Sequence, residues 1–290
     1  MNFNKINVIG VPFNSDGTTP DLENPPQGLR DSGLIESLTG LGFRVLDNGD
    51  LDIPPGDGIV DIHSGILNFN SLLKTTQTLS TKIIDTWESD FFQLILGGDC
   101  AILIGIYDAI SKMGRNIGLA FFDGHADFHN LETSQTYEAA DFELAILTGR
   151  GKHGIKRLSD KFPLLKDDEI VAFGLSELDL IEESSIKFYM VDDLRERGTS
   201  ECINQGLLKF KNQKPIWLHF DVDVIDLKEM PVFIPTEHGL TCKATGDFLR
   251  NIFKEYNICG MSISCYHPNL DNNLILGKKL VSMLKIIKTY

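Results

Sequence analysis

Short runs of apolar residues alternate along the chain with segments in which Leu and Ile recur every three or four positions. The runs favour buried strands, and the periodic segments favour helices. Strands are predicted over residues 5–12, 43–47, 91–96, 117–122, 169–174, 214–220 and 258–264. Helices are predicted over residues 28–42, 68–85, 101–113 and 245–256.

Strands that alternate with helices along a whole chain predict a parallel sheet covered on both faces, so the expected fold class is α/β with a mainly parallel central sheet. No internal repeat and no linker divides the sequence, and one domain is expected over residues 1–290. Residues 13–27 carry several Pro and Asp residues, Pro25 and Pro26 among them, and are predicted to form a surface loop.

The composition narrows the class of partner. Hydrophobic residues make up 42% and charged residues 23% of the chain, which is ordinary for a globular protein. A formal net charge of -14 argues against a nucleic-acid partner and against an anionic membrane surface. Five cysteines without a CxxC pair favour free thiols in a reducing compartment, and no apolar run approaches the ~18 residues of a membrane span. A cytoplasmic protein is expected.

The candidate chemistry begins where one predicted strand ends. The apolar run of residues 117–122 leads directly into Asp123, His125 and Asp127. In a strand, residues two apart project to the same side, so these side chains should converge on one point. Paired carboxylates repel unless a proton or a cation lies between them, and two carboxylates with an imidazole suit a divalent cation.

Two further strand ends carry the same kind of residue. Asp99 and Cys100 follow one strand, and Asp221 and Asp223 follow another. Open α/β sheets bind ligands at the carboxyl ends of their strands. Asp-rich turns are commonly solvated, but three such strand ends in one chain favour a metal site. The pattern of a phosphate-binding loop is missing.

The motifs that carry these residues resemble those of the arginase (ureohydrolase) family in order and spacing. They are Gly97-Gly-Asp-Cys100, Asp123-Gly-His-Ala-Asp127 and Asp221-Val-Asp-Val-Ile-Asp226, and weaker likeness extends over nearly the whole chain. The resemblance implies a three-layer α/β/α fold, a binuclear manganese site, and a homo-oligomer, commonly a trimer or hexamer. It also implies metal-activated water that hydrolyses a non-peptide C–N bond in a guanidino or amidine-like small molecule.

Carried over position by position, the resemblance implies two bridging carboxylates, Asp123 and Asp221. Asp127 would complete the shell of the first metal ion, and His125 and Asp223 that of the second. Oxygen and imidazole ligands suit a hard ion such as Mn²⁺. Asp127 is also counted among the candidate catalytic residues.

Three departures from the family pattern put part of the chemistry in doubt. Cys100 stands where the family has a histidine ligand, so the first metal could be weakly bound, absent, or replaced by Zn²⁺, Fe²⁺, Co²⁺ or Ni²⁺. Cys265 stands where a glutamate pairs with the guanidinium, and Ala140 where the family has its proton-shuttle histidine. The chain resembles a divergent subgroup with the same Gly-Gly-Asp-Cys form, which favours a different substrate over accidental decay.

Other residues are candidates for the missing roles. Asp141, His129 or His238 could replace the proton shuttle. By resemblance, Asp179 would help to hold an amino group of the substrate, and Thr241 would lie near the reacting carbon. Two hypotheses follow: a metal-dependent hydrolase, or a non-catalytic arginase-fold protein that acts as a binding or assembly subunit.

Overall fold

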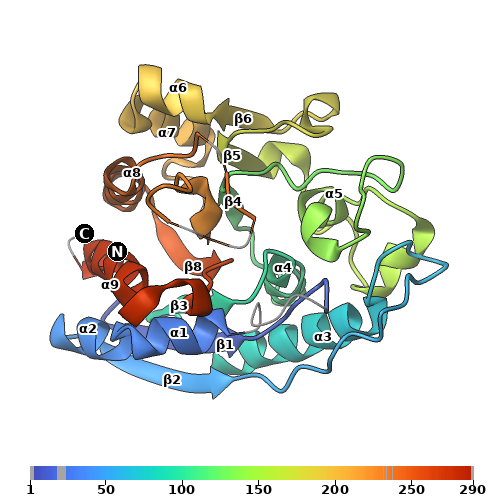
Figure 1. Cartoon of the computed structure of the whole chain (residues 1–290), viewed down its shortest axis with the longest axis horizontal. Coiled ribbons are helices and arrows are strands. Elements are labelled where there is room, and N and C mark those ends of the chain that lie inside the picture. Colours follow the sequence, from blue (N-terminus) through green and yellow to red (C-terminus); the bar gives the residue numbers. More distant parts are fainter. Residues whose placement is uncertain (1–2, 18–23, 231, 233, 237, 289–290) are drawn as a thin grey trace.

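The computed structural model describes residues 3–17, 24–230, 232, 234–236 and 238–288 (Figure 1). Within these residues, eight strands form one sheet in the order β2-β1-β3-β8-β7-β4-β5-β6. Every neighbouring pair is parallel, which confirms the predicted fold class. The strands are β1 (Lys5–Val11), β2 (Arg44–Asp50), β3 (Phe91–Gly97), β4 (Gly118–Phe122), β5 (Ile170–Leu175), β6 (Lys187–Met190), β7 (Ile216–Asp221) and β8 (Ile258–Ser264).

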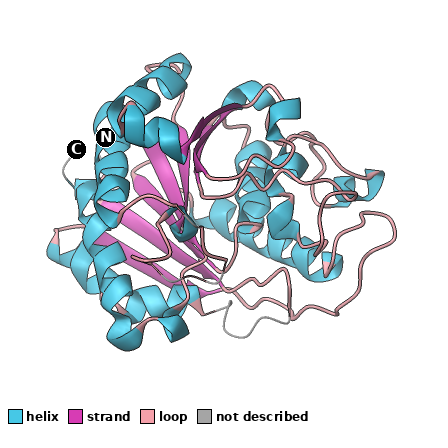
Figure 2. Ribbon diagram, turned by 45° about the horizontal axis from the view of Figure 1, so that its top comes forward, coloured by secondary structure: helices cyan, strands magenta, loops and turns pink. Residues whose placement is uncertain are grey.

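Helices cover both faces of the sheet, so the fold has three layers (Figure 2). One layer contains α1 (Pro25–Asp31), α2 (Leu34–Gly40), α6 (Val191–Glu196), α7 (Thr199–Leu207), α8 (Cys242–Glu255) and α9 (Ile275–Met283). The other contains α3 (Phe69–Thr86), α4 (Ile102–Lys112) and α5 (Glu143–Leu147). No helix of the described residues is both long enough and apolar enough to cross a lipid bilayer.

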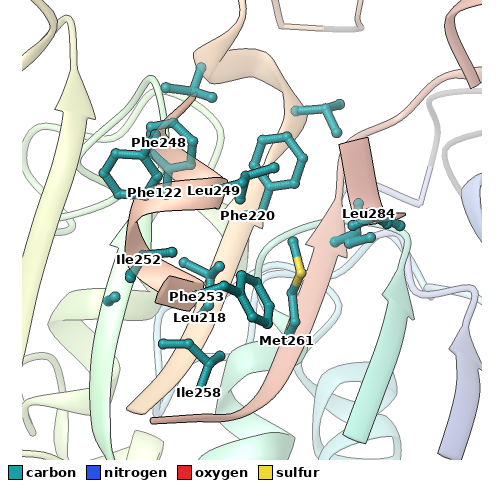
Figure 3. Close-up of a cluster of buried hydrophobic side chains, with 14 of the residues drawn as sticks. Phe122, Leu218, Phe220, Phe248, Leu249, Ile252, Phe253, Ile258, Met261 and Leu284 are labelled. Carbon is teal, nitrogen blue, oxygen red and sulfur yellow. The ribbon is translucent and has the colours of Figure 1, made fainter. Parts of the chain in front are cut away.

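The two cores follow from the alternation of side chains along the strands. In β4, Ala120 and Phe122 belong to one core, whereas Leu119 and Phe121 belong to the other. The rings of Phe122 and Phe248 stack with centroids 3.8 Å apart, which fixes α8 against β4 (Figure 3). Because these strands are buried on both faces, their sequences are apolar throughout rather than alternating.

The structure corrects several predicted elements. Pro25 and Pro26 begin α1 and are buried, so the surface loop predicted over residues 13–27 was wrong at its end; residues 18–23 lie outside the described residues. Proline is favoured in the first turn of a helix because its missing N–H has no partner there. The helix predicted over residues 28–42 is two helices, broken at Gly33, whose φ is 87°. The edge strand β6 and the helices α5, α6, α7 and α9 were not predicted.

Candidate metal centre

The order of the strands brings the predicted site together. The strands β3, β8, β7 and β4 are consecutive neighbours, so their carboxyl ends lie side by side. Cys100 follows β3, Asp123 follows β4, and Asp221 is the last residue of β7. Gly124 permits the tight approach of two of these ends, because a Cβ there would lie 2.2 Å from Thr236 Oγ1 and 3.0 Å from Asp223 Oδ1.

One oxygen of each central aspartate is fixed by a backbone N–H. Asp123 Oδ1 accepts from the N–H of His125 at 2.8 Å, and Asp221 Oδ1 accepts from the N–H of Asp223 at 2.7 Å. Asp223 Oδ1 accepts from the N–H of Gly124 at 3.1 Å. The β4 and β7 ends are thereby tied to each other, and the second oxygen of each carboxylate is free to face the centre.

The second oxygens contact the remaining predicted ligands. Asp223 Oδ2 lies 3.0 Å from His125 Nδ1, and Asp221 Oδ2 lies 2.6 Å from Cys100 Sγ. Cys100 Sγ is also 3.6 Å from Asp123 Oδ2. The potential ligand atoms fall into three overlapping groups, each with all atoms within 4.8 Å of one another: Asp123, His125 and Asp223; Cys100, Asp123, His219 and Asp221; and Cys100, Asp123, Asp127 and Glu143.

All six residues predicted as metal ligands therefore lie in one cluster. The structure adds two residues that the sequence reasoning missed. His219 was treated as a neighbour of a motif, although a histidine inside an apolar strand was a signal. Glu143 lies in a mainly apolar segment without a motif, and only the fold brings it to the cluster.

The cluster carries a large excess of buried negative charge. Asp123 and Asp221 are each 1% exposed. Burial, and then the neighbouring carboxylates, raises the pKa of Asp123 well above its usual range and that of Asp221 to about 8. Burial alone would lower the pKa of His125, but Asp223 and the other aspartates outweigh it and raise that pKa to about 10. One imidazolium cannot neutralise this many carboxylates, so the donor set fits divalent cations.

His219 adds no positive charge. Burial lowers the pKa of His219 to about 3, so its imidazole is neutral at physiological pH. Its Nδ1 lies 2.8 Å from Ser262 Oγ, and its Nε2 lies 3.3 Å from Ser264 Oγ. Ser264 Oγ in turn donates to Asp221 Oδ2 at 3.1 Å. His219 therefore supports Asp221 through a hydroxyl, and its Nε2 is 3.9 Å from Asp123 Oδ2.

A cavity of about 120 Å³ opens onto the cluster, and most of the ionisable residues that line it are acidic, with His125 and His129 as the exceptions. Besides residues of the metal cluster, it contains Asp99, Glu138, Asp141, Glu177 and Asp179; none of the described residues that line it is Lys or Arg. Burial and then Asp141 raise the pKa of Glu138 to about 8. Burial raises the pKa of Asp99 to about 6, although hydrogen bonds from Ser15, including one from its backbone N–H, act to lower it.

The residues predicted to handle substrate and protons divide into two sets. His129, Asp141 and Asp179 line the cavity, as does Ala140. His129 Nε2 lies 3.3 Å from Asp179 Oδ1. Asp141 Oδ2 accepts from two hydroxyls, those of Ser134 and Thr136.

The structure does not bring Thr241 or His238 to the cavity. Thr241 is the N-cap of α8, where its hydroxyl oxygen accepts from the N–H of Ala244 at 3.1 Å. A threonine before a helix satisfies the first free N–H groups. The expected place of Thr241 near the reacting carbon stays a prediction. His238 is exposed, and its carbonyl accepts from Arg195.

Together, the parallel sheet and the acidic cluster at the ends of β3, β4 and β7 define an α/β protein with a buried group of residues that could bind metal ions. The sequence profile of the Arginase family matches residues 4–285. The chain belongs to the arginase family.

Individual relatives agree with this assignment. The chain is 29% identical to an arginase of Staphylococcus aureus (strain MRSA252), over 96% of this chain and 95% of that protein. The crystal structure of an arginase from Bacillus subtilis superimposes with a TM-score of 0.87 at 26% identity and covers 99% of both chains. The Bacillus caldovelox arginase structure, at 23% identity, shares the fold with a TM-score of 0.91 over 99% of both chains.

These relatives confirm the prediction of an arginase-family hydrolase, and they do not favour the non-catalytic alternative.

Proposed function

We propose that the chain is a metal-dependent hydrolase of a C–N bond in a small cationic guanidino or amidine compound. The observation that carries the proposal is the acidic cavity that opens directly onto the buried carboxylate cluster. A cavity whose acidic lining residues outnumber its two histidines, and whose described lining contains no Lys or Arg, selects for a cation. Guanidinium and amidinium groups are planar cations that carboxylates recognise through paired hydrogen bonds.

In this proposal two divalent cations occupy the cluster. Asp123 and Asp221 would be shared between them, with Asp127 and Cys100 on one side and His125 and Asp223 on the other. When bound, divalent cations supply Lewis-acid activation of water near neutral pH. Mn²⁺ is the first candidate, because most of the donors are carboxylate oxygens; the thiol of Cys100 leaves Zn²⁺, Fe²⁺, Co²⁺ or Ni²⁺ as alternatives on its side.

The chain's own residues would bind and orient the substrate. Asp179 and Glu177 belong to the cavity lining, and their carboxylates would accept hydrogen bonds from a cationic group. Because Cys265 cannot hold a guanidinium in an ion pair, these carboxylates would take over that task. His129 is held between Thr133 Oγ1 at 3.1 Å and Asp179, and we propose that it or Asp141 moves the proton to the leaving nitrogen.

A substrate screen with variants tests the proposal. Arginine, agmatine, guanidinobutyrate, formimidoylglutamate and guanidine are incubated with protein loaded with Mn²⁺, Ni²⁺ or Zn²⁺. Asp123→Ala and Asp221→Ala should lose bound metal and turnover together. Asp226→Ala is the matched control, because Asp226 closes the same motif but its Oδ1 accepts from the N–H of Lys228 outside the cluster. Unchanged metal content in both cluster variants would contradict the proposal.

The quaternary structure and location are also proposals. The family resemblance supports a homo-oligomer, commonly a trimer or hexamer, and a monomer by light scattering would count against it. The composition supports a cytoplasmic location, which cell fractionation would check.

A further inference from the structure

Glu143 is a buried carboxylate at the start of α5. It is 0% exposed, and within the part of the chain that the structure describes its carboxylate accepts no hydrogen bond from an N–H group or a hydroxyl; only the carboxyl group of Asp127 lies beside it. The other four residues of α5 pack into the apolar core. A buried carboxylate that accepts no hydrogen bond is unfavourable unless it binds a proton or a cation.

The carboxylate of Glu143 faces the Cys100 side of the cluster. One of its oxygens lies within 4.8 Å of Cys100 Sγ and of a carboxylate oxygen from each of Asp123 and Asp127. Asp127 has a φ of 47°, in the left-handed region that residues other than glycine rarely adopt. This conformation turns the chain after His125 so that Asp127 joins the same group as Glu143 and not the group of His125 and Asp223.

The two sides of the cluster differ in their donors. The His125 side combines an imidazole with the carboxylates of Asp123 and Asp223. The Cys100 side contains a soft thiol, and hard cations such as Mn²⁺ prefer oxygen. Glu143 offers an additional oxygen donor on the side that carries the thiol.

We infer that Glu143 is a ligand of the metal ion on the Cys100 side of the centre. It provides there the hard donor that Cys100 does not. The inference rests on the proposed metal-dependent function, but it assigns a ligand that neither the motifs nor the family resemblance indicates.

The test compares Mn²⁺ binding by the full-length wild type and by Glu143→Gln. Titration calorimetry, with electron paramagnetic resonance of the free ion, gives the number and affinity of the sites. We expect two ions in the wild type and, in the variant, loss of one ion or at least a tenfold weaker affinity for it, since removing even a residue that supports a ligand commonly weakens binding 10–100-fold. Glu132→Gln is the control, because Glu132 is an exposed residue of the same β4–α5 connection and its replacement removes the same charge.

Thermal unfolding of the metal-free proteins separates a ligand from a structural residue. If Glu143 is a ligand, metal-free Glu143→Gln should be as stable as the wild type or more stable, because the variant no longer buries a carboxyl group with only another carboxyl group beside it. Its stabilisation by added Mn²⁺ should be smaller. Glu143→Asp is measured alongside, and its shorter side chain should also weaken the affinity at least threefold.

Three results would overturn the inference. Glu143→Gln and Glu143→Asp could bind both ions as tightly as the wild type, which would leave the proposed function intact. Both could be markedly less stable than the wild type without metal, which would show a structural role. A wild type that binds no divalent cation would overturn both the inference and the proposed function.

Discussion

Without bound metal, the protein should become less stable as the pH rises from 5 to 7. This is the opposite of the trend that carboxylates with a lowered pKa produce. The perturbation is exhaustive chelation followed by thermal unfolding from pH 5 to pH 7. Asp221 is 1% exposed, and its pKa in the folded chain is raised to about 8. A carboxyl group with a raised pKa keeps its proton in the folded state but loses it in the unfolded state. Its contribution to stability is therefore full below about pH 4 and is lost as the pH rises towards about 8.

The size of the effect follows from one proton. Each proton held only by the folded state lowers the free energy of unfolding by about 1.4 kcal/mol per pH unit, so Asp221 accounts for about 3 kcal/mol between pH 5 and pH 7. At about 2–4 °C per kcal/mol, Tm should fall by roughly 6–12 °C. His125, with a pKa raised to about 10, acts in the same direction above about pH 6.5, because its protonated form is stabilised only in the folded chain. Asp47, whose pKa is lowered beside Arg30, changes stability only below about pH 4.

Metal-loaded protein is the first control. Bound cations keep the carboxylates ionised, so Tm should be higher and nearly constant over the same range. Asp221→Asn is the second control, and it should reduce the slope of the metal-free protein. A metal-free Tm that stays level or rises from pH 5 to pH 7 would refute the reasoning, because the buried carboxylates would then not retain a proton.

Four further outcomes are expected. Cys100→Ala should weaken Zn²⁺ binding at least tenfold and change Mn²⁺ affinity by less than about threefold, as measured by competition with a chelating dye, because the thiolate is the soft donor. Gly124→Ala should lower metal affinity roughly tenfold without removing a ligand, since its Cβ would displace Asp223; calorimetry measures this. Phe248→Ala should lower the free energy of unfolding in urea by about 3–5 kcal/mol, whereas Leu208→Ala, at a side chain that is 66% exposed, should change it by less than about 0.5 kcal/mol. Asp179→Asn should raise KM for a cationic substrate more than it lowers kcat, and an effect on kcat alone would place Asp179 in proton transfer instead.

The sequence was sufficient for the central strands of the sheet because burial on both faces makes them apolar over most of their length. The edge strand β6 escaped prediction because it is only four residues long, begins with an exposed Lys187 and pairs with β5 alone. The short helices escaped because five to nine residues are too few for a reliable periodicity. The helical spacing of Leu and Ile continues from residue 28 to residue 42, so it gave no sign that the helix is interrupted at Gly33.

The sequence predicted those residues of the candidate site that follow the end of a strand at a fixed spacing. Parallel strands bring their carboxyl ends to one edge, so Asp123, His125 and Asp221 could be placed from the motifs alone. Glu143 could not, because the long β4–α5 connection determines its position and no local pattern encodes that path. The role of Thr241 stays a prediction from a matching motif, and in the structure its hydroxyl group caps α8.

The hydrogen bonds of the cluster imply that its two sides are not equally prepared for metal. On the His125 side, backbone N–H groups fix Asp123 and Asp223, and Asp223 in turn contacts His125. These contacts come from the ends of adjacent strands and exist once the sheet has formed. On the Cys100 side, Glu143 has only the carboxyl group of Asp127 beside its carboxylate, and burial raises the pKa of the Cys100 thiol. A cation displaces a proton on either side, because the pKa of His125 is also raised, but only on the Cys100 side does it meet a soft thiolate, so affinity on that side depends more strongly on the identity of the metal.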